Sequence, residues 1–394
     1  MIGGVQNYCT LLSEALTARG SSITVYSSQL SSRDKWQNDL PASQNISGVK
    51  VKRFSALRRG PVTWRLYHWC EKRYASRPKA VYELGLMLAV GPVSTRLPYA
   101  IVAHRHETSL VHLFGVYSAF VGEAFIAARV GRLPVVITPF IHTTSPIGLN
   151  MSWKRRILKM ADHVVAMTPS EKTYLEREIG LRPQQVSVVS PGLRPTDYPT
   201  IEQSEARRRL GLPNEAFVAL FIGRKELYKG IGTLFQAYRE LQKNHKTQCR
   251  LILIGPDVDL ASSVQEGEDE GIVDLGKVDH ATKLLALNAC DCLVLPSTSE
   301  SFGIVILEAW AVAKPVVVTR LPSTQDIVTD NEDGLLFEMG DTVQLGEALY
   351  RLAADPTMAM DMGQNGQRRF FACYSSSVVA ERVQRIYDSL AKTA

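Results

Sequence analysis

The sequence predicts two α/β domains, each built on a parallel sheet with helices on both faces. Short runs rich in Val, Ile and Leu, typical of strands buried on both faces, alternate along the chain with segments of helical spacing. The length of 394 residues is enough for about two domains of roughly 150–200 residues. A Pro- and Gly-rich stretch, residues 191–195, reads as a linker. We therefore expect one domain over residues 1–195, a second over 196–372, and a final segment over 373–394.

The first domain is expected to begin with a helix that follows Gly3 and Gly4 and ends at Gly20. Thr168 and Glu171 have the spacing of a capping box, with Pro169 at the first helical position. The apolar runs predict strands over residues 23–26, 49–54, 110–114, 134–139, 164–167 and 186–189, and helical spacing predicts a helix over 117–130.

The second domain shows the same alternation. Expected strands cover residues 217–222, 251–255, 292–295, 315–319 and 333–337, and expected helices cover 206–210, 281–289 and 378–390. Its most informative part is 291–319, which reads strand, loop, helix, strand. Pro315 opens the last of these strands, where no ladder donor is lost.

Two carboxylates flank the helix within that stretch. Glu300 lies in the loop, Gly303 opens the helix, and Glu308 lies further into it. Open α/β sheets bind ligands at the carboxyl ends of their strands, and the first N–H groups of a helix suit a phosphate. A carboxylate on each side could accept hydrogen bonds from vicinal hydroxyls, which together describes a nucleotide sugar. The alternative is that Glu300 caps the helix and Glu308 lies on a solvated face. Either residue alone would favour that alternative, but both together favour function.

Arg224 and Lys229 predict a second anion-binding corner. They follow the strand over 217–222 and come just before the helix that begins at Ile231. Arg can hold a diphosphate with its planar fork, and Lys adds a point charge. The alternative is a pair of surface charges after a turn.

The order Glu300-Ser301-Phe302-Gly303, followed by Glu308-Ala309, resembles the E-x7-E signature of the family 4 (group 1) glycosyltransferases. The resemblance implies the GT-B fold, in which two doubly wound domains face a cleft and the final helix returns to the first domain. It also implies transfer of a sugar, with retention, from a nucleoside-diphosphate-sugar to a hydroxyl acceptor.

The same resemblance assigns roles to particular residues. Glu308 would bind the ribose hydroxyls, Glu300 the donor sugar, and Arg224 and Lys229 the diphosphate, including the charge that grows on the leaving group. His142, just past the strand over 134–139, would lie near the reacting sugar. The remaining implied donor-binding residues are Gly3 and Gly4 near phosphate and acceptor, Val278 near the base, and Ser301, Phe302, Gly303 and Ile304 through backbone groups.

We expect no cofactor and no metal, because the sequence has no DxD-like pair and the six cysteines have no zinc spacing. The sequence also departs from the family at its start. The family begins with an apolar strand before the glycine loop, whereas only Met1 and Ile2 precede Gly3 here. That strand is central in a doubly wound sheet, so we expect the first strand to be missing from this chain, which we interpret as an N-terminal truncation.

Charge is distributed unevenly. Residues 1–198 carry 25 Lys and Arg against 12 Asp and Glu, whereas the remainder carries 20 against 27. Residues 52–79 hold nine basic side chains among several aromatic ones, and the basic residues Lys154, Arg155, Arg156 and Lys159 follow on a later helix. This pattern favours an anionic membrane surface slightly over a solvated basic face. No nucleic-acid-binding motif is present.

These features predict the setting of the protein. No apolar run reaches the ~20 residues of a membrane span. Scattered cysteines fit a reducing cytoplasm, so we expect a cytoplasmic protein, peripheral on the inner face of the membrane, with a lipid-linked or cell-surface glycan as acceptor. Three alternatives stay open: a nucleotide-sugar epimerase of the same fold, a non-catalytic nucleotide-sugar-binding protein, and a membrane-associated scaffold.

Overall fold

The structure is a computed structural model, and the chain divides into two compact units that are described separately. The second-half unit comprises Ser190–Val379 with Met1–Gly4 and His142–Thr144, and the first-half unit comprises Val5–Ile141, Ser145–Val189 and Ala380–Ala394. The domain boundaries expected from the sequence stay predictions. The structure describes residues 4–31, 37–57, 65, 68–70, 72–73, 82–83, 85–86, 91–116, 118–142, 152–245, 248–258 and 271–391.

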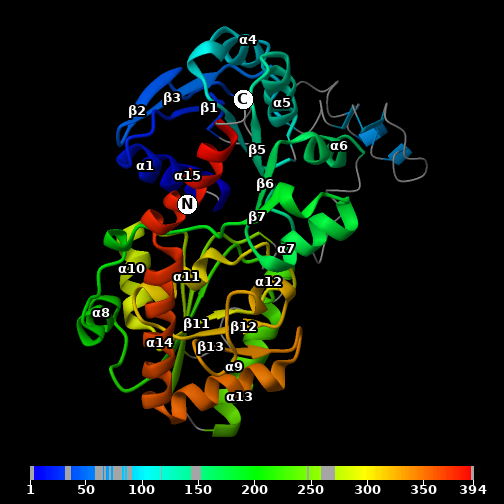
Figure 1. Cartoon of the computed structure of the whole chain (residues 1–394). Helices are drawn as coiled ribbons and strands as arrows, with labels where there is room; N and C mark the ends of the chain where they lie inside the picture. Colours follow the sequence, from blue (N-terminus) through cyan, green and yellow to red (C-terminus); the bar gives the residue numbers. More distant parts are fainter. Residues whose placement is uncertain are drawn as a thin grey trace. The chain divides into compact units, whose positions relative to one another are not determined.

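The second-half unit is built on one six-stranded sheet in which every pairing is parallel (Figure 1). The strand order is β10-β9-β8-β11-β12-β13. The strands are β8 (Phe217–Ile222), β9 (Cys249–Ile254), β10 (Ile272–Gly276), β11 (Cys292–Leu295), β12 (Val316–Thr319) and β13 (Gly334–Phe337). The helices are α8 (Gln203–Leu210), α9 (Ile231–His245), α10 (His280–Ala289), α11 (Ile304–Ala311), α12 (Pro322–Gln325), α13 (Thr342–Ala354), α14 (Pro356–Arg369) and α15 (Ser376–Ala391), which continues into the first-half unit.

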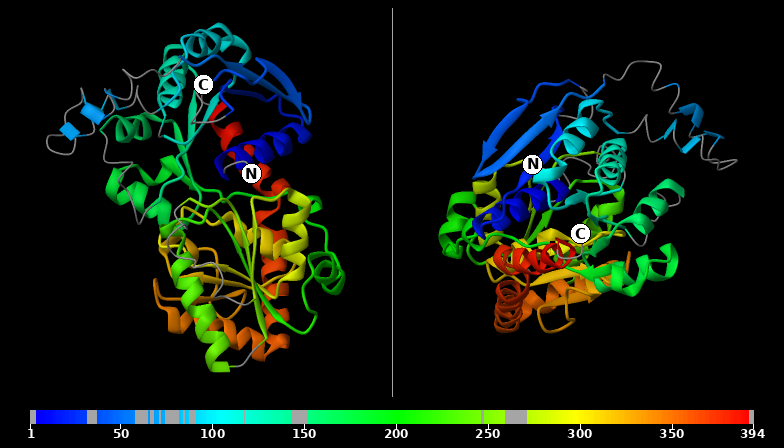
Figure 2. Two further views of the ribbon diagram at one scale, coloured as in Figure 1. Left: turned by 180° about the vertical axis from the view of Figure 1, so that it is seen from behind. Right: turned by 45° about the horizontal axis from the view of Figure 1, so that its top comes forward.

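Both faces of this sheet are covered. Along β8, Phe217, Ala219 and Phe221 pack in one apolar cluster with α9 and α13. The alternating residues Val218 and Leu220 point the other way and are fully buried as well. Figure 2 shows the helices around the sheet from two further directions. The continuous apolar runs of the sequence are therefore central strands of a doubly wound sheet, as predicted.

The first-half unit differs because its strands form two sheets. One holds β1 (Thr24–Ser28), β3 (Val49–Phe54) and β2 (Ser43–Ile46), in that order. The other holds β4 (Val111–Phe114), β5 (Val135–Thr138), β6 (His163–Ala166) and β7 (Val186–Val188), all parallel. The helices of this unit are α1 (Gly4–Ala18), α4 (Arg96–Ala103), α5 (Ala119–Val130), α6 (Ser152–Met160) and α7 (Pro169–Tyr174).

Within the described residues, no strand pairing joins the two sheets of the first-half unit. They nevertheless share a core, because Tyr26 of β1 and Phe54 of β3 pack against the cluster that contains Leu113 of β4. In the part of the chain that the structure describes, β1 and β4 are edge strands of their sheets. The missing first strand stays a prediction.

Two polar side chains, the half-buried His112 and the buried Glu171, tie this unit together. His112 of β4 lies 2.6 Å from the Tyr387 hydroxyl of α15 and 2.8 Å from the Thr138 hydroxyl of β5. Burial lowers the pKa of His112 to about 3, so its ring is neutral at pH 7.

Glu171 of α7 is the second of these side chains. It accepts hydrogen bonds from the backbone N–H groups of Ile141 (2.9 Å) and Met167 (2.7 Å). The predicted capping box is therefore only half formed, since Thr168 accepts from the Glu171 N–H but the Glu171 carboxylate bonds elsewhere.

The expected membrane-facing region is only partly described. Most of residues 52–79 lie outside the described residues, as does Gly3. On α6 the prediction of a basic face is partly wrong, because Lys154 is 5% exposed, and burial lowers its pKa to about 8.

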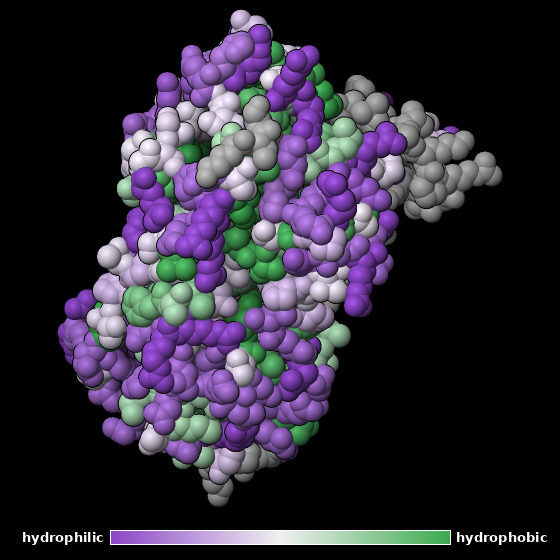
Figure 3. Space-filling model, viewed as in Figure 1, coloured by the Kyte–Doolittle hydropathy of each residue, from purple (hydrophilic) through white to green (hydrophobic). Residues whose placement is uncertain are grey.

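Hydrophilic side chains cover most of the face in Figure 3. Among the described residues, no helix is long and apolar enough to cross a bilayer.

Candidate active site

The sheet of the second-half unit has a topological switch point between β8 and β11. From β8 the chain proceeds to β9 and β10 on one side, then crosses back to place β11 on the other side of β8. Loops that leave neighbouring strands in opposite directions open a crevice at their carboxyl ends, where such sheets bind ligands. The predicted residues Arg224 and Lys229 follow β8, and Glu300 follows β11.

The two loops contact each other closely. The Thr298 N–H donates to the Tyr228 carbonyl at 2.8 Å. Gly230 has φ +69°, and a Cβ there would stand 1.9 Å from the Pro296 carbonyl oxygen. Only glycine fits this crossing, which fixes the loop after β8 against the loop after β11.

Lys229 and Glu300 meet across the switch point. The Lys229 ammonium lies 2.5 Å from the Glu300 carboxylate, and their side chains are 15% and 8% exposed. A predicted phosphate-binding cation and a predicted sugar-binding carboxylate are thus brought together from residues 71 positions apart. The pairing also shows that Lys229 is not a loose surface charge.

Arg224 is held by two residues that sequence reasoning missed. Its guanidinium lies 2.7 Å from the Glu226 carboxylate and donates to the Tyr228 hydroxyl at 2.8 Å. The ring of Tyr228 also lies near both cations, 5.8 Å from the Arg224 guanidinium and 5.1 Å from the Lys229 ammonium. Glu226 and Tyr228 lie in the same loop as Arg224, and this closeness in sequence could have identified them.

The helix between the two carboxylates begins as expected. Gly303 is the N-cap of α11 with φ +85°, and a Cβ there would stand 2.8 Å from a Leu295 methyl group. Glu300 therefore does not cap the helix. Phe302 is 3% exposed and packs edge-on against Tyr374, so its side chain faces the core and only its backbone is available to a ligand. Ser301 and Ile304 are half-buried beside it.

Glu308 is buried rather than solvated, so the alternative of a solvated helix face is wrong. It is 3% exposed and accepts hydrogen bonds from the Tyr198 hydroxyl at 2.9 Å and the Lys283 ammonium at 2.6 Å. Sequence reasoning missed both partners. No local pattern could have found them, since they lie 110 and 25 positions away.

Lys225, next to Arg224, was also missed. It is fully buried and pairs with Asp257 at 2.7 Å and with Asp274. Asp274 in turn accepts from the Gly276 N–H at 2.8 Å. This cluster ties together the carboxyl ends of β8, β9 and β10. Val278, which follows β10 in the chain, is half-buried.

His142 belongs to the same compact unit as these residues. Its Nδ1 lies 3.2 Å from the Ser299 hydroxyl, next to Glu300 in the chain. Burial lowers the pKa of His142, Glu300 raises it, and Lys229 and Arg224 lower it. The contact with Ser299 places His142 beside the loop that carries Glu300. Gly4 is the first residue of α1, and a Cβ there would have open space around it.

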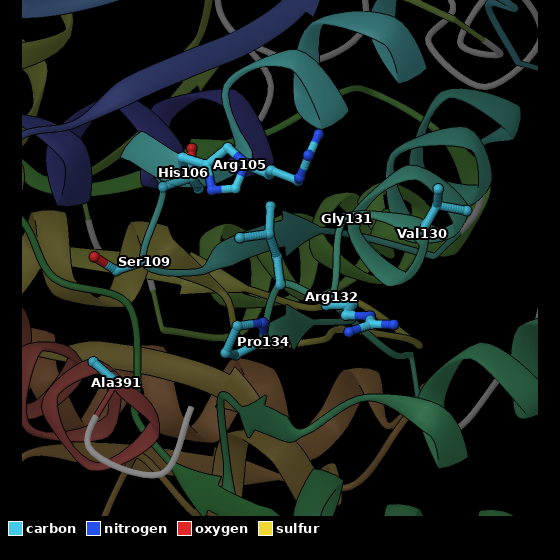
Figure 4. A pocket seen from close by; sticks show the side chains of 10 residues that line it. Arg105, His106, Ser109, Val130, Gly131, Arg132, Pro134 and Ala391 are labelled. Carbon is cyan, nitrogen blue, oxygen red and sulfur yellow. The ribbon is translucent and has the colours of Figure 1, made fainter.

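A separate cavity of about 660 Å³ lies in the first-half unit (Figure 4). It is lined by segments that precede β4 and β5, including Arg105, His106 and Arg132. It therefore lies at the amino ends of these strands, opposite to the end where parallel sheets bind ligands. The guanidinium groups of Arg105 and Arg132 do not converge in Figure 4, so we do not assign the cavity to the active site.

A doubly wound sheet whose switch point carries paired cations and carboxylates is consistent with a sugar-transferring enzyme of the GT-B class. The chain belongs to the family 4 (group 1) glycosyltransferases. Residues 202–369 match the family model described as glycosyl transferases group 1, and residues 2–197 match the model described as glycosyltransferase family 4. The resemblance noted in the sequence, the GT-B fold and the assignment as a glycosyltransferase are confirmed.

Two relatives and one solved structure show how similar the chain is to known proteins. The chain is 26% identical over 393 residues to D-inositol 3-phosphate glycosyltransferase of Acidothermus cellulolyticus, covering 91% of this chain and 80% of the relative. It is 26% identical over 400 residues to phosphatidyl-myo-inositol mannosyltransferase of Mycobacterium leprae, covering 99% and 94%. The solved structure of Anabaena HepE in complex with UDP and glucose superposes with a TM-score of 0.73 at 20% identity, covering 98% of this chain and 96% of HepE.

Proposed function

We propose that this glycosyltransferase moves a sugar, with retention of anomeric configuration and without a metal ion, from a nucleoside-diphosphate-sugar to an acceptor hydroxyl. One observation carries the proposal. The Lys229 ammonium lies 2.5 Å from the Glu300 carboxylate, just ahead of the helix that holds Glu308, and this arrangement supports a phosphate-binding role for Lys229 and a sugar-binding role for Glu300.

Each side chain has a role in this reaction. Glu308 accepts from the ribose hydroxyls, and Glu300 accepts from hydroxyls of the donor sugar. Arg224 and Lys229 stabilise the charge that grows on the diphosphate as the bond from the anomeric carbon to its oxygen breaks. The acceptor oxygen forms the new bond on the face that the diphosphate leaves, and the acceptor proton passes to a diphosphate oxygen. His142 lies near the sugar, and Val278 and the backbone from Ser301 to Ile304 line the donor site.

UDP is the first nucleotide to test, because the HepE structure contains UDP and glucose. The named relatives act on an inositol phosphate and on phosphatidyl-myo-inositol, which supports a cyclitol or lipid-linked hydroxyl as acceptor. We place the enzyme in the cytoplasm, at the inner face of the membrane. The exposed Arg156 and Lys159 of α6 support this placement.

Thermal stability of the purified chain against UDP, GDP, ADP and CDP, with and without EDTA, tests the donor site. A ligand that binds only the folded state raises stability with the logarithm of its concentration over Kd. We expect one nucleotide to raise the melting temperature regardless of EDTA, and Glu308→Ala to remove the effect. A shift that EDTA abolishes would contradict metal independence, and no shift with any nucleotide would contradict the donor site.

Turnover variants test the chemistry. Lys229→Ala and Glu300→Gln should each reduce kcat by about 10²–10³-fold, the usual cost of removing one group that stabilises transition-state charge. Glu347→Ala, on an exposed part of α13, is the matched control and should leave kcat unchanged. The anomeric configuration of the product, read by NMR, tests retention. Near-parental turnover in both site variants, or an inverted product, would contradict the assignment.

A further inference from the structure

Among the described residues, the hydrogen bonds to the Glu308 carboxylate all go to one of its two oxygens. The Tyr198 hydroxyl and the Lys283 ammonium both bond to Oε1, at 2.9 and 2.6 Å. The three side chains are almost enclosed, with Tyr198 7% exposed overall and the side chains of Lys283 and Glu308 16% and 4% exposed. A carboxylate fixed through Oε1 presents Oε2 in a defined direction, as the acceptor that remains for a ligand.

The two donors are themselves fixed. The Lys283 ammonium lies 5.8 Å from the centroid of the Tyr198 ring. The His280 ring packs edge-on against the same Tyr198 ring, with 5.5 Å between the centroids. The His280 ring nitrogen Nε2 lies 2.8 Å from the Asp197 carbonyl oxygen. Burial, and then the neighbouring Glu308, raises the pKa of Tyr198, so its hydroxyl remains a donor to the carboxylate.

Lys283 has more donors than Glu308 uses. An ammonium carries three N–H groups and no acceptor, and one N–H points to Oε1. If the 2′-hydroxyl of a ribose donates to Oε2 of Glu308, the oxygen of that hydroxyl comes within reach of a second Lys283 N–H. A 2′-deoxyribose would leave both groups without this partner, and an unpaired buried polar group is costly.

We propose that Lys283 and Tyr198 are positioning residues that make this site select ribonucleotides over 2′-deoxyribonucleotides. The selection rests on the proposed function, because it requires the nucleotide to bind with its ribose at Glu308. Tyr198 aligns the Glu308 carboxylate. Lys283 aligns it as well and donates a second N–H to the oxygen of the ribose hydroxyl.

The test is the ratio of two dissociation constants, measured by calorimetry. UDP is compared with 2′-deoxy-UDP, and GDP with 2′-deoxy-GDP, on the parent chain and on Lys283→Met, Lys283→Arg and Tyr198→Phe. For the nucleotide that binds, the parent should prefer the ribose form by roughly 10- to 100-fold, the size expected for one or two lost buried hydrogen bonds. Lys283→Met should reduce the preference to about threefold or less, Tyr198→Phe should reduce it partly, and Lys283→Arg should retain most of it.

The control is Lys243→Met, an exposed lysine near the far end of α9, which should keep the parental ratio. A variant that only loosened the fold would weaken both nucleotides alike and leave the ratio unchanged. If the parent binds nucleotide through Glu308 but the ratio is unaffected in both Lys283→Met and Tyr198→Phe, the inference is overturned while the proposed function stands. If neither UDP nor GDP nor their deoxy forms bind the parent, the proposed function itself fails.

Discussion

The two compact units build their sheets differently. The second-half unit has one continuous six-stranded sheet, and each predicted donor-binding cation at its switch point is paired with a carboxylate. The first-half unit has a three-stranded and a four-stranded sheet that share a core without a joining strand pair among the described residues. A continuous sheet holds its loops by backbone pairing as well as by packing. The comparison teaches that the predicted donor side is preorganised, whereas the first-half unit depends more on side-chain packing.

The largest expected effect comes from a matched pair of core substitutions. Phe125 of α5 and Phe235 of α9 are 4% and 3% exposed and belong to separate apolar clusters. Each change to Ala should destabilise its own unit by about 3–5 kcal/mol. Urea unfolding is monitored by hydrogen exchange with mass spectrometry, which reports on the two units separately. We expect the first-half unit to unfold at lower urea, and each variant to shift only its own transition. One shared transition that both variants shift equally would contradict the comparison.

A strand added before Gly4 should reduce the difference between the units. A segment of ~5 apolar residues has the length of a common strand, and it could pair with β1 or β4, which are edge strands among the described residues. We expect this extension to raise the urea midpoint of the first-half unit and to leave that of the second-half unit unchanged. The matched control is a Gly/Ser extension of equal length. Equal effects of the two extensions would show that no strand forms there.

Glu171 should give the first-half unit a pH dependence of its own. Burial raises the pKa of its carboxyl from 4.5 to about 7. The hydrogen bonds from the backbone N–H groups of Met167 and Ile141 lower the pKa, but burial is the larger effect. A raised folded-state pKa contributes stability that is complete below pH 4.5 and is lost as the pH rises through about 7.

The free energy of unfolding, measured from pH 4 to 8 for the parent and for Glu171→Gln, tests this dependence. The stability advantage of the parent over the variant should be largest at the acid end and should shrink as the pH rises through about 7. A constant difference across this range would rule out titration of Glu171 as its source.

The smallest effect is expected at the cavity before β4 and β5. Arg105→Ala with Arg132→Ala changes its charge but lies at the amino ends of the strands. Turnover and nucleotide affinity should stay within about twofold of the parent, because ligands of parallel sheets bind at the opposite end. A larger loss of turnover, with unfolding midpoints unchanged, would assign the cavity a part in the reaction.

Local patterns predicted most of the fold and part of the site. Buried strands of the second-half unit read directly as apolar runs, and the glycines at 230 and 303 mark tight loop contacts. The residues that hold Glu308 could not be predicted, because Tyr198 and Lys283 reach it only through tertiary folding. The same holds for Lys225, whose burial depends on its partners Asp257, after β9, and Asp274 of β10. The half-formed capping box failed for the same reason: Glu171 found a partner, Ile141, from another loop.

The paired cations of the switch point have a consequence for competition in the cell. Arg224 and Lys229 each already have a carboxylate partner, Glu226 or Glu300. An anion such as free phosphate must share or displace these partners, so it gains less than it would from two unpaired cations. In the proposed function, the phosphate of a donor displaces the Glu300 carboxylate from Lys229, and the sugar hydroxyls of the same donor then give Glu300 new hydrogen-bond partners. Under the proposed function, the site would therefore bind small anions weakly and favour a ligand that carries both the charge and the sugar.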